Sequence, residues 1–372
     1  MGARIFAGEA WYDQHALVMS DGRIETLLVA EALPDDMLVE ELDGGVLLPG
    51  FVDTQVNGGG GVLFNDKPTV SGISSIVEAH RNFGTTAMLP TLISDDLEVI
   101  ANAIAAVDDA IEAGVPGIVG IHIEGPFLNP GKHGIHDAGK FRSLDADTVA
   151  LLSSLKYGKT LVTLAPELAP EGAIAALVKN GVVVAAGHTL ATYDDMQRAI
   201  GEGLAGVTHL FNAMTQMDSR APGVVGASMD SDLICGIIAD GHHVHPASLR
   251  AAYRAKGNKE LMLVTDAMPT VGSDLTKFTV GGTEVMASGG TLRSNDGTLA
   301  GSDLDMSRAL RNCVQLMHAD IGSASQMASR TPAEFIGIGD AYGRISEGYR
   351  ADLVHLDDTL NVKDVWIAGE KA

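Results

Sequence analysis

The sequence predicts an α/β protein: a (β/α)8 TIM barrel with a small β-sandwich domain built from both termini. The chain has 372 residues, enough for one large barrel with a smaller unit attached. From Val46 onward, apolar runs alternate with segments of helical period, which is typical of repeated βα units. Strand-like segments without intervening helices occur near both ends. A doubly wound open sheet is the main alternative.

The two ends of the chain resemble each other in their pattern. Short apolar segments separated by turn residues suggest strands near the N-terminus, and two similar segments close the chain. The expected strands are 4–7, 16–20, 23–29, 351–356 and 362–368. We therefore expect residues 1–48 and 344–372 to pair into one β domain and residues 49–343 to form the catalytic barrel.

The segment between the two ends contains eight apolar runs that we interpret as barrel strands. They are 48–53, 86–92, 118–124, 160–165, 182–186, 206–210, 233–239 and 261–265. Helical periodicity is clearest at 95–113, 172–180, 193–201, 246–256, 303–318 and 332–336. Glycine-rich residues 280–301 predict a hairpin inserted after the last barrel strand.

Composition narrows the class of protein. The formal net charge of −23 argues against nucleic acid or an anionic membrane as a partner. An anionic substrate would therefore need a local basic pocket. No apolar run approaches the roughly 20 residues that span a bilayer, and the N-terminus does not resemble a secretory signal. With Cys235 and Cys313 expected to be free thiols, we expect a cytoplasmic protein.

Four polar residues lie at or just after the ends of four separate apolar runs: Glu124, His188, His209 and Asp266. In a barrel, the C-terminal ends of the strands meet on one face. One carboxylate and two imidazoles suit a catalytic divalent metal, and the second carboxylate suits a general base. Each residue alone has an ordinary explanation, such as a helix cap or a hydrogen-bonded core histidine. Four together favour a metal site.

Several longer motifs resemble the N-acetylglucosamine-6-phosphate deacetylase family of the amidohydrolase superfamily. The resemblance follows the chain in order from about residue 4 to the C-terminus. Its motifs are LPGFVDTQVNGGGG (48–61), GIHIEGPFLNPGKHGIHD (120–137), VTLAPE (162–167), AAGHTLATYDDM (185–196), THLFNAM (208–214), RAPGVVGA (220–227), IADGHHVHP (238–246), LVTDA (263–267) and GTLAGSDLDM (297–306).

This resemblance implies an activity and a catalytic set. The expected reaction is hydrolysis of N-acetyl-D-glucosamine 6-phosphate to D-glucosamine 6-phosphate and acetate. The implied metal ligands are Glu124, His188 and His209. Asp266 would accept a proton from the attacking water and return it to the departing amine. His136 would stabilise the oxyanion together with the metal.

The resemblance also implies residues that bind the substrate. Similarity assigns Gln55, His136, Asn212, the backbone amide of Ala213, Arg220, His243, Leu299 and Gly301 to the substrate. Arg220 and His243 suit a phosphate because both offer donors to its oxygens. In the family, the equivalent of Arg220 reaches the site of a neighbouring subunit. This implies a homodimer that takes a small phosphosugar.

The expected number of metal ions follows from one difference between this sequence and those of many amidohydrolases. Many amidohydrolases have a His-x-His pair after the first barrel strand, whereas this chain has Gln55-Val56-Asn57. An amide oxygen is a weaker ligand than an imidazole. We therefore expect one divalent ion per subunit, with Gln55 near the site through water. Zinc is the first expectation, and iron or another divalent ion the second.

Three alternatives remain at this stage. N-acetylgalactosamine 6-phosphate differs from the expected substrate in the orientation of one hydroxyl, and no residue that senses this hydroxyl is evident. A cyclic-amide hydrolase or nucleobase deaminase would need His-x-His at 55–57 and no phosphate pocket. A non-catalytic scaffold of the same fold would be expected to lose a ligand or the base, but all four residues are present.

Overall fold

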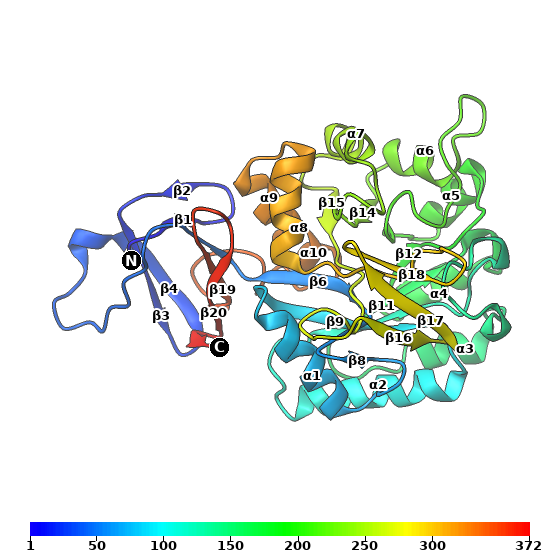
Figure 1. The fold of residues 1–372 in the computed structure, drawn as a ribbon, viewed down its shortest axis with the longest axis horizontal. Helices are drawn as coiled ribbons and strands as arrows, with labels where there is room; N and C mark the ends of the chain where they lie inside the picture. Colours follow the sequence, from blue (N-terminus) through cyan, green and yellow to red (C-terminus); the bar gives the residue numbers. More distant parts are fainter.

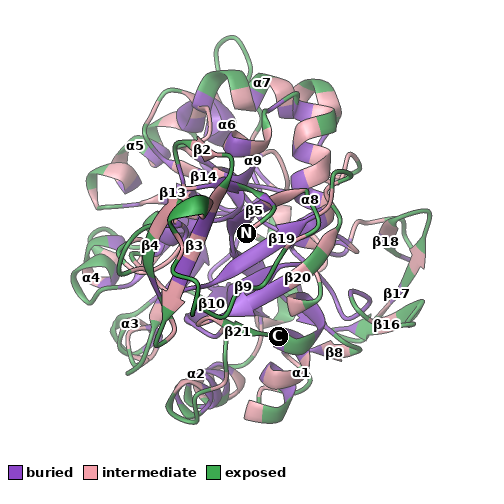
Figure 2. Ribbon diagram, turned by 90° about the vertical axis from the view of Figure 1, so that its left-hand side faces the viewer, coloured by how far each residue is buried: buried purple, intermediate pink, exposed green.

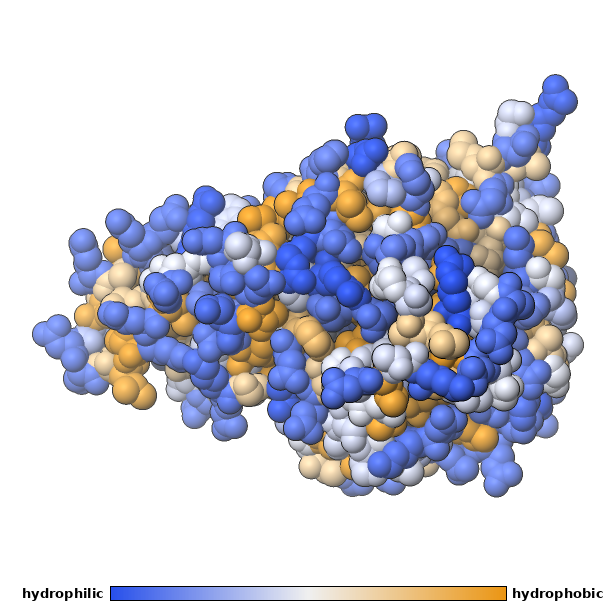
Figure 3. All heavy atoms as spheres, viewed as in Figure 1, coloured by the Kyte–Doolittle hydropathy of each residue, from blue (hydrophilic) through white to orange (hydrophobic).

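The computed structural model describes residues 1–372 as a barrel with a smaller β domain at one side (Figure 1). Both termini lie in the smaller domain (Figure 1). On the face drawn in Figure 3, hydrophilic residues cover most of the surface and hydrophobic residues form small separate areas. No helix combines the length and apolar character that crossing a bilayer requires.

Eight parallel strands form the barrel, each hydrogen-bonded to the next along the chain. They are β6 (Phe51–Val56), β9 (Thr85–Ile93), β10 (Gly120–Glu124), β11 (Lys159–Leu164), β12 (Val183–Ala186), β13 (Gly206–Val207), β14 (Ile234–Ile237) and β15 (Leu261–Leu263). The first and last strands meet where Asp266 N donates to Gln55 O at 2.9 Å and Val56 bridges to Ala267. The predicted closed barrel is confirmed, and the open sheet is excluded.

Helices surround these strands. They are α1 (Val70–Arg81), α2 (Leu97–Glu112), α3 (Ala146–Leu152), α4 (Ala173–Lys179), α5 (Tyr193–Gly201), α6 (Gly223–Met229), α7 (Pro246–Lys256), α8 (Met306–Asn312), α9 (Ile321–Ala328) and α10 (Arg330–Phe335). A π-helix, Cys313–Met317, continues α8. Single 3-10 turns occupy 30–32, 130–132, 138–140 and 166–168. Figure 2 shows buried strands at the centre and exposed residues on the outer faces of the helices.

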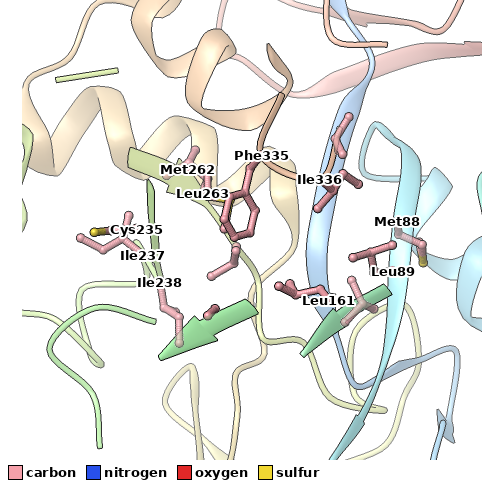
Figure 4. Packing of buried hydrophobic residues seen from close by; sticks show 14 of the residues in the cluster. Met88, Leu89, Leu161, Cys235, Ile237, Ile238, Met262, Leu263, Phe335 and Ile336 are labelled. Carbon is pink, nitrogen blue, oxygen red and sulfur yellow. The ribbon is translucent and has the colours of Figure 1, made fainter. Parts of the chain in front are cut away.

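Aliphatic side chains fill the interface between strands and helices. Parallel strands covered on both faces are mostly apolar, and β6 and β9 are buried along their entire length. Figure 4 shows Phe335 of α10 beside Met262 and Leu263 of β15. Cys235 and Cys313 are both buried free thiols, as expected.

The small domain is a sandwich of two β layers, which confirms this part of the predicted fold. One layer has the strand order β2 (Trp11–Tyr12), β1 (Arg4–Phe6), β5 (Val46–Pro49), β19 (Leu353–Leu356), β20 (Val362–Ile367) and β21 (Glu370–Lys371). The other is the hairpin β3 (His15–Ser20) with β4 (Arg23–Val29). Their own apolar core includes Ile5, Ile24, Leu47, Leu353 and Trp366.

The predicted strand 48–53 is two strands in two different sheets. β5 pairs with β1 and β19 in the small domain, whereas β6 begins the barrel. Gly50 separates them, and a Cβ added there would lie 2.2 Å from Thr86 Oγ1. Its N–H donates to Asp352 O at 2.8 Å. A glycine is therefore needed where the chain passes closely between the two sheets.

Other differences lie at the C-terminal side of the barrel. The predicted hairpin 280–301 is a three-stranded antiparallel sheet of β16 (Lys277–Val280), β17 (Thr283–Ser288) and β18 (Thr291–Ser294). A second hairpin, β7 (Gly58–Gly59) with β8 (Val62–Leu63), follows β6. The predicted strand 206–210 ends at Val207, because His209 has a positive φ of 33° that removes it from the ladder.

Candidate active site

The candidate residues surround one pocket at the C-terminal end of the barrel strands. Its volume is about 410 Å³, and its lining includes Glu124, His136, His188, His209 and Asp266. A larger cavity of about 520 Å³ lies in the small domain, but its lining is mostly apolar. The barrel pocket, and not this cavity, therefore brings the candidate residues together.

Glu124, His188 and His209 converge on one point. Glu124 ends β10, while the two histidines follow β12 and β13. Glu124 Oε1 lies 3.2 Å from His188 Nε2 and 3.0 Å from His209 Nε2, and the two Nε2 atoms are 3.1 Å apart. Burial alone would raise the pKa of Glu124, but the hydrogen bonds and charges of the two histidines hold it well below its ordinary value.

The donor set fits a divalent cation. His188 Nδ1 lies 2.7 Å from Lys132 O, a bond that requires the proton on Nδ1 and leaves Nε2 as the ring atom that faces Glu124 and His209. His209 Nδ1 is buried without a partner. Ligand atoms about 2.0 Å from a tetrahedral ion are about 3.3 Å apart, close to the separations found here. A metal-binding histidine usually donates the N–H of its other ring nitrogen to a carboxylate, a backbone carbonyl or water.

The backbone is strained where the candidate residues leave the strands. His188, His209, Ala213 and Asp266 have positive φ values of 48°, 33°, 50° and 52°. Non-glycine residues rarely adopt this region, and it concentrates at functional sites. These conformations end the strands and place the polar residues at the pocket.

Asp266 lies against two amide side chains. Asn57 Nδ2 donates to Asp266 Oδ1 at 2.6 Å, and Gln55 Nε2 approaches the same oxygen at 3.2 Å. Gln55 Nε2 also lies 3.1 Å from Glu124 Oε2. Burial and the charge of Glu124 raise the pKa of Asp266 to about 6. Oδ2 makes no hydrogen bond with the protein and remains available to a ligand.

His136 is held as a neutral hydrogen-bond donor. The backbone N–H of Ser94 donates to His136 Nδ1 at 3.3 Å, with Ser94 Oγ at 2.8 Å. Burial, followed by the charge of His188, lowers the pKa of His136 to about 3. Since Nδ1 accepts, the single proton of the neutral ring is on Nε2. His136 can therefore donate to an oxygen in the pocket.

Most of the predicted substrate-binding residues also line this pocket: Asn212, Ala213, His243, Leu299 and Gly301. Two do not. Gln55 is buried beneath the lining, and its Nε2 bonds to the carboxylates of Glu124 and Asp266. Arg220 is exposed and lies outside the pocket of its own chain, where its N–H approaches Asp218 Oδ1 at 3.3 Å.

Three supporting residues had not been singled out in the sequence. Asn57 stands where many amidohydrolases have a histidine, and this difference does not by itself indicate a bond to Asp266. Asp240 bonds to His243 and lies three residues before it in the IADGHHVHP motif, a spacing that could have indicated the pair. Ser94 reaches His136 from the end of β9. No sequence signal connects Ser94 with His136, because they lie 42 residues apart.

Comparison with known proteins decides the family. Residues 46–372 match the model described as "Amidohydrolase family", and residues 1–47 match the "NagA composite domain". The chain belongs to the amidohydrolase family. Together with the cluster of Glu124, His188 and His209, membership makes this amidohydrolase a metal-dependent hydrolase, as predicted.

The similar proteins compared here are named as deacetylases of N-acetylated hexosamine 6-phosphates. The amidohydrolase is 46% identical to the N-acetylgalactosamine-6-phosphate deacetylase of Shewanella sp. (strain ANA-3), over 99% of this chain and 94% of that protein. It is 33% identical to the crystal structure of N-acetylglucosamine-6-phosphate deacetylase from Pasteurella multocida, with a TM-score of 0.97 over 100% and 98% of the chains. A variant of the Mycobacterium smegmatis enzyme, in complex with N-acetyl-D-glucosamine 6-phosphate, is 32% identical, with a TM-score of 0.91 over 99% and 97%.

Proposed function

We propose that this amidohydrolase deacetylates N-acetyl-D-glucosamine 6-phosphate to D-glucosamine 6-phosphate and acetate. The observation that supports this proposal is that one pocket is lined by Glu124, His188, His209, Asp266 and His136. Three relatives with similar chains are deacetylases of acetylated hexosamine 6-phosphates. The same pocket has residues suited to a phosphate, including His243 and the backbone amide of Ala213.

Each of these pocket side chains has its own role in the proposed reaction. Glu124, His188 and His209 would hold one divalent ion, which supplies acidification of a water molecule and polarisation of the amide carbonyl. Asp266 takes a proton from the attacking water at Oδ2, because Asn57 and Gln55 occupy Oδ1. It then gives that proton to the departing sugar nitrogen, since a protonated amine leaves more readily. His136 Nε2–H donates to the carbonyl oxygen as negative charge develops there.

The metal, assembly and location belong to the same proposal. We expect one ion per subunit, with zinc first and iron or another divalent ion second, because two histidines and a carboxylate accept several metals. Arg220, exposed on its loop, would reach the phosphate in the active site of a second subunit of a homodimer. A cytoplasmic location remains a prediction.

N-acetylgalactosamine 6-phosphate is the second candidate substrate. It is favoured by the 46% identity to the Shewanella enzyme, which exceeds the identity to the two glucosamine enzymes compared above. The two sugars differ at one hydroxyl, so the catalytic residues serve either. The residues proposed to bind the metal and the phosphate act on groups that both sugars share, so they do not distinguish the two substrates.

The test is a direct assay of both sugars. Purified protein loaded with Zn²⁺ is incubated with each acetylated hexosamine 6-phosphate and with unphosphorylated N-acetylglucosamine, and released amine and acetate are quantified. We expect the highest kcat/KM on N-acetylglucosamine 6-phosphate and poor turnover without the phosphate. A higher kcat/KM on the galactosamine compound would favour the second candidate. No release of acetate from either phosphosugar would refute both.

A further inference from the structure

A buried acid–imidazole pair at the pocket wall is not used by the chemistry described above. Asp240 Oδ2 lies 2.6 Å from His243 Nδ1. Asp240 Oδ1 accepts the backbone N–H groups of His242 and His243, each at 2.8 Å. Both side chains of the pair are only 7% exposed. All three hydrogen bonds that Asp240 accepts therefore come from His242 and His243.

The segment that carries Asp240 and His243 is also held by residues of α8 and of the π-helix that follows it. It follows β14, and Asn312 Nδ2 donates to Ala239 O at 2.8 Å. Asn312 is the residue before the π-helix Cys313–Met317, a type of helical irregularity that is frequent at functional sites. Leu316 of that helix approaches Gly241, where an added Cβ would lie 3.3 Å from it. The position of the pair is therefore fixed by the barrel.

The pair decides which nitrogen of His243 faces the pocket. Burial would raise the pKa of Asp240, but the bonds from His243 and the two backbone amides hold it below its ordinary value, so Asp240 is a carboxylate. A carboxylate can only accept, which places a proton on Nδ1. Nε2 makes no hydrogen bond with the protein, and His243 lines the pocket. Nε2 is therefore the ring atom left for a ligand.

A second proton on Nε2 gives the ring a full positive charge. Asp240 on one side and a phosphate on the other would both stabilise the imidazolium, and a charge-assisted bond to phosphate is stronger than a neutral one. This contribution matters in a chain of net charge −23 whose Arg220 lies outside its own pocket. Without the carboxylate of Asp240, the charged ring would lose the counter-charge to which it is hydrogen-bonded.

We propose that Asp240 is a positioning residue that holds His243 as a cationic Nε2–H donor to the phosphate group of the substrate. The inference rests on the proposed function for the identity of the substrate. It assigns to Asp240 an effect on binding that acts through His243, without contact between Asp240 and the reacting atoms.

Asp240→Asn is a sharp test because it keeps the support of the backbone. The N–H groups of residues 242 and 243 require an acceptor, so the amide oxygen takes the place of Oδ1. The NH₂ group then faces His243 Nδ1, which must become an acceptor. The ring is left neutral, with its proton on Nε2. The variant therefore removes the positive charge of His243 while preserving a donor.

Steady-state kinetics should show a specific loss. We expect KM for the phosphorylated sugar to rise about tenfold, the difference between a charge-assisted and a neutral hydrogen bond, with kcat changed by less than about twofold. The unphosphorylated sugar should show no matching rise in KM. Asp358→Asn, the same change at an exposed position, is the control. In a His243→Ala background, Asp240→Asn should have no further effect on KM.

Nitrogen-15 NMR of histidine-labelled protein provides a readout independent of turnover. Wild-type His243 should carry its proton on Nδ1 and gain one on Nε2 when inorganic phosphate is added, whereas Asp240→Asn should show Nε2–H alone. An unchanged KM, an equal rise for both sugars, or an unaltered His243 tautomer in the variant would overturn the inference. If the wild-type protein cleaves neither phosphosugar, the proposed function fails, while the NMR titration still tests the pair.

Discussion

The side-chain amide of Asn57 donates a 2.6 Å hydrogen bond to Oδ1 of Asp266, across the seam where the first and last barrel strands meet. Asn57 follows β6, and Asp266 follows β15. The bond occupies one carboxylate oxygen and leaves the other free for the proton transfer proposed above. Asn57, in the place where many amidohydrolases have a histidine, thus orients the proposed base.

Asn57→Ala should impair catalysis more than folding. Without Asn57, Asp266 Oδ1 keeps only the longer 3.2 Å bond from Gln55 Nε2 and is held less firmly. We expect kcat to fall about 10-fold to 100-fold, a typical cost of losing a partner of an active-site group. Steady-state kinetics and thermal unfolding measure the two effects. Asn82→Ala, at an exposed helix end, is the control. A kcat equal to wild type would show that Asn57 does not orient Asp266.

Asp266→Asn should separate metal binding from turnover. The three ligands are untouched, so the variant should bind metal as the wild type does. An amide cannot accept the proton of the attacking water, and kcat should fall by about 10³-fold or more. Elemental analysis and amine release on the same sample measure both. Substantial turnover by metal-loaded Asp266→Asn would assign the proton transfer to another group.

Metal content should be one ion per chain, and it should depend on His209. The NH₂ groups of Gln55 and Asn57 contact Asp266, and an amide oxygen is a weaker metal ligand than an imidazole, so we expect no second ion at these two residues. Elemental analysis after dialysis should give about one equivalent for wild type and far less for His209→Gln, which loses one of three ligands. Two ions at full occupancy would contradict the single-metal site. Chelation should abolish turnover, and added Zn²⁺ should restore it.

Arg220 should act across a subunit interface. Arg220→Ala should raise KM for the phosphorylated sugar, because the exposed side chain would no longer reach the neighbouring pocket. Mixed dimers of Arg220→Ala and Asp266→Asn contain one site with both residues intact. At low substrate, random mixing should therefore recover about a quarter of wild-type activity. No recovery from dimers shown to exchange subunits would mean that Arg220 serves its own chain.

Asp53 should give the protein a pH-dependent stability. Burial raises the pKa of Asp53 to about 7, against the opposing hydrogen bonds from Thr265 and Gln55. The folded state then binds a proton more tightly than the unfolded chain between about pH 4 and 7. The free energy of unfolding should fall as pH rises through this window, by up to about 1.4 kcal/mol per pH unit from this group.

Asp53→Asn provides the comparison because it cannot ionise. In urea unfolding at matched metal content, the variant should gain stability relative to wild type as pH rises from 5 to 8. Asp358→Asn, exposed to solvent, should show a constant difference. If the difference between Asp53→Asn and wild type is also constant with pH, Asp53 does not change its protonation on unfolding.

The periodicity of the sequence was sufficient for the barrel and for the union of both termini. Runs such as 86–92 and 118–124 are mostly apolar because parallel strands are buried on both faces. Strand ends were less predictable. The strand expected at 206–210 stops at Val207. The positive φ of His209 ends it, and the apolar pattern of the sequence does not indicate this backbone conformation.

By itself, the sequence determined the fold class, the family and the residues placed at the pocket, because motifs and periodicity are local properties of the chain. Only the tertiary structure decided how those residues work together. The proton on His136 depends on Ser94, and the free oxygen of Asp266 on Asn57. Each of these bonds joins segments far apart in the sequence. Their geometry exists only once the strands have closed into a barrel.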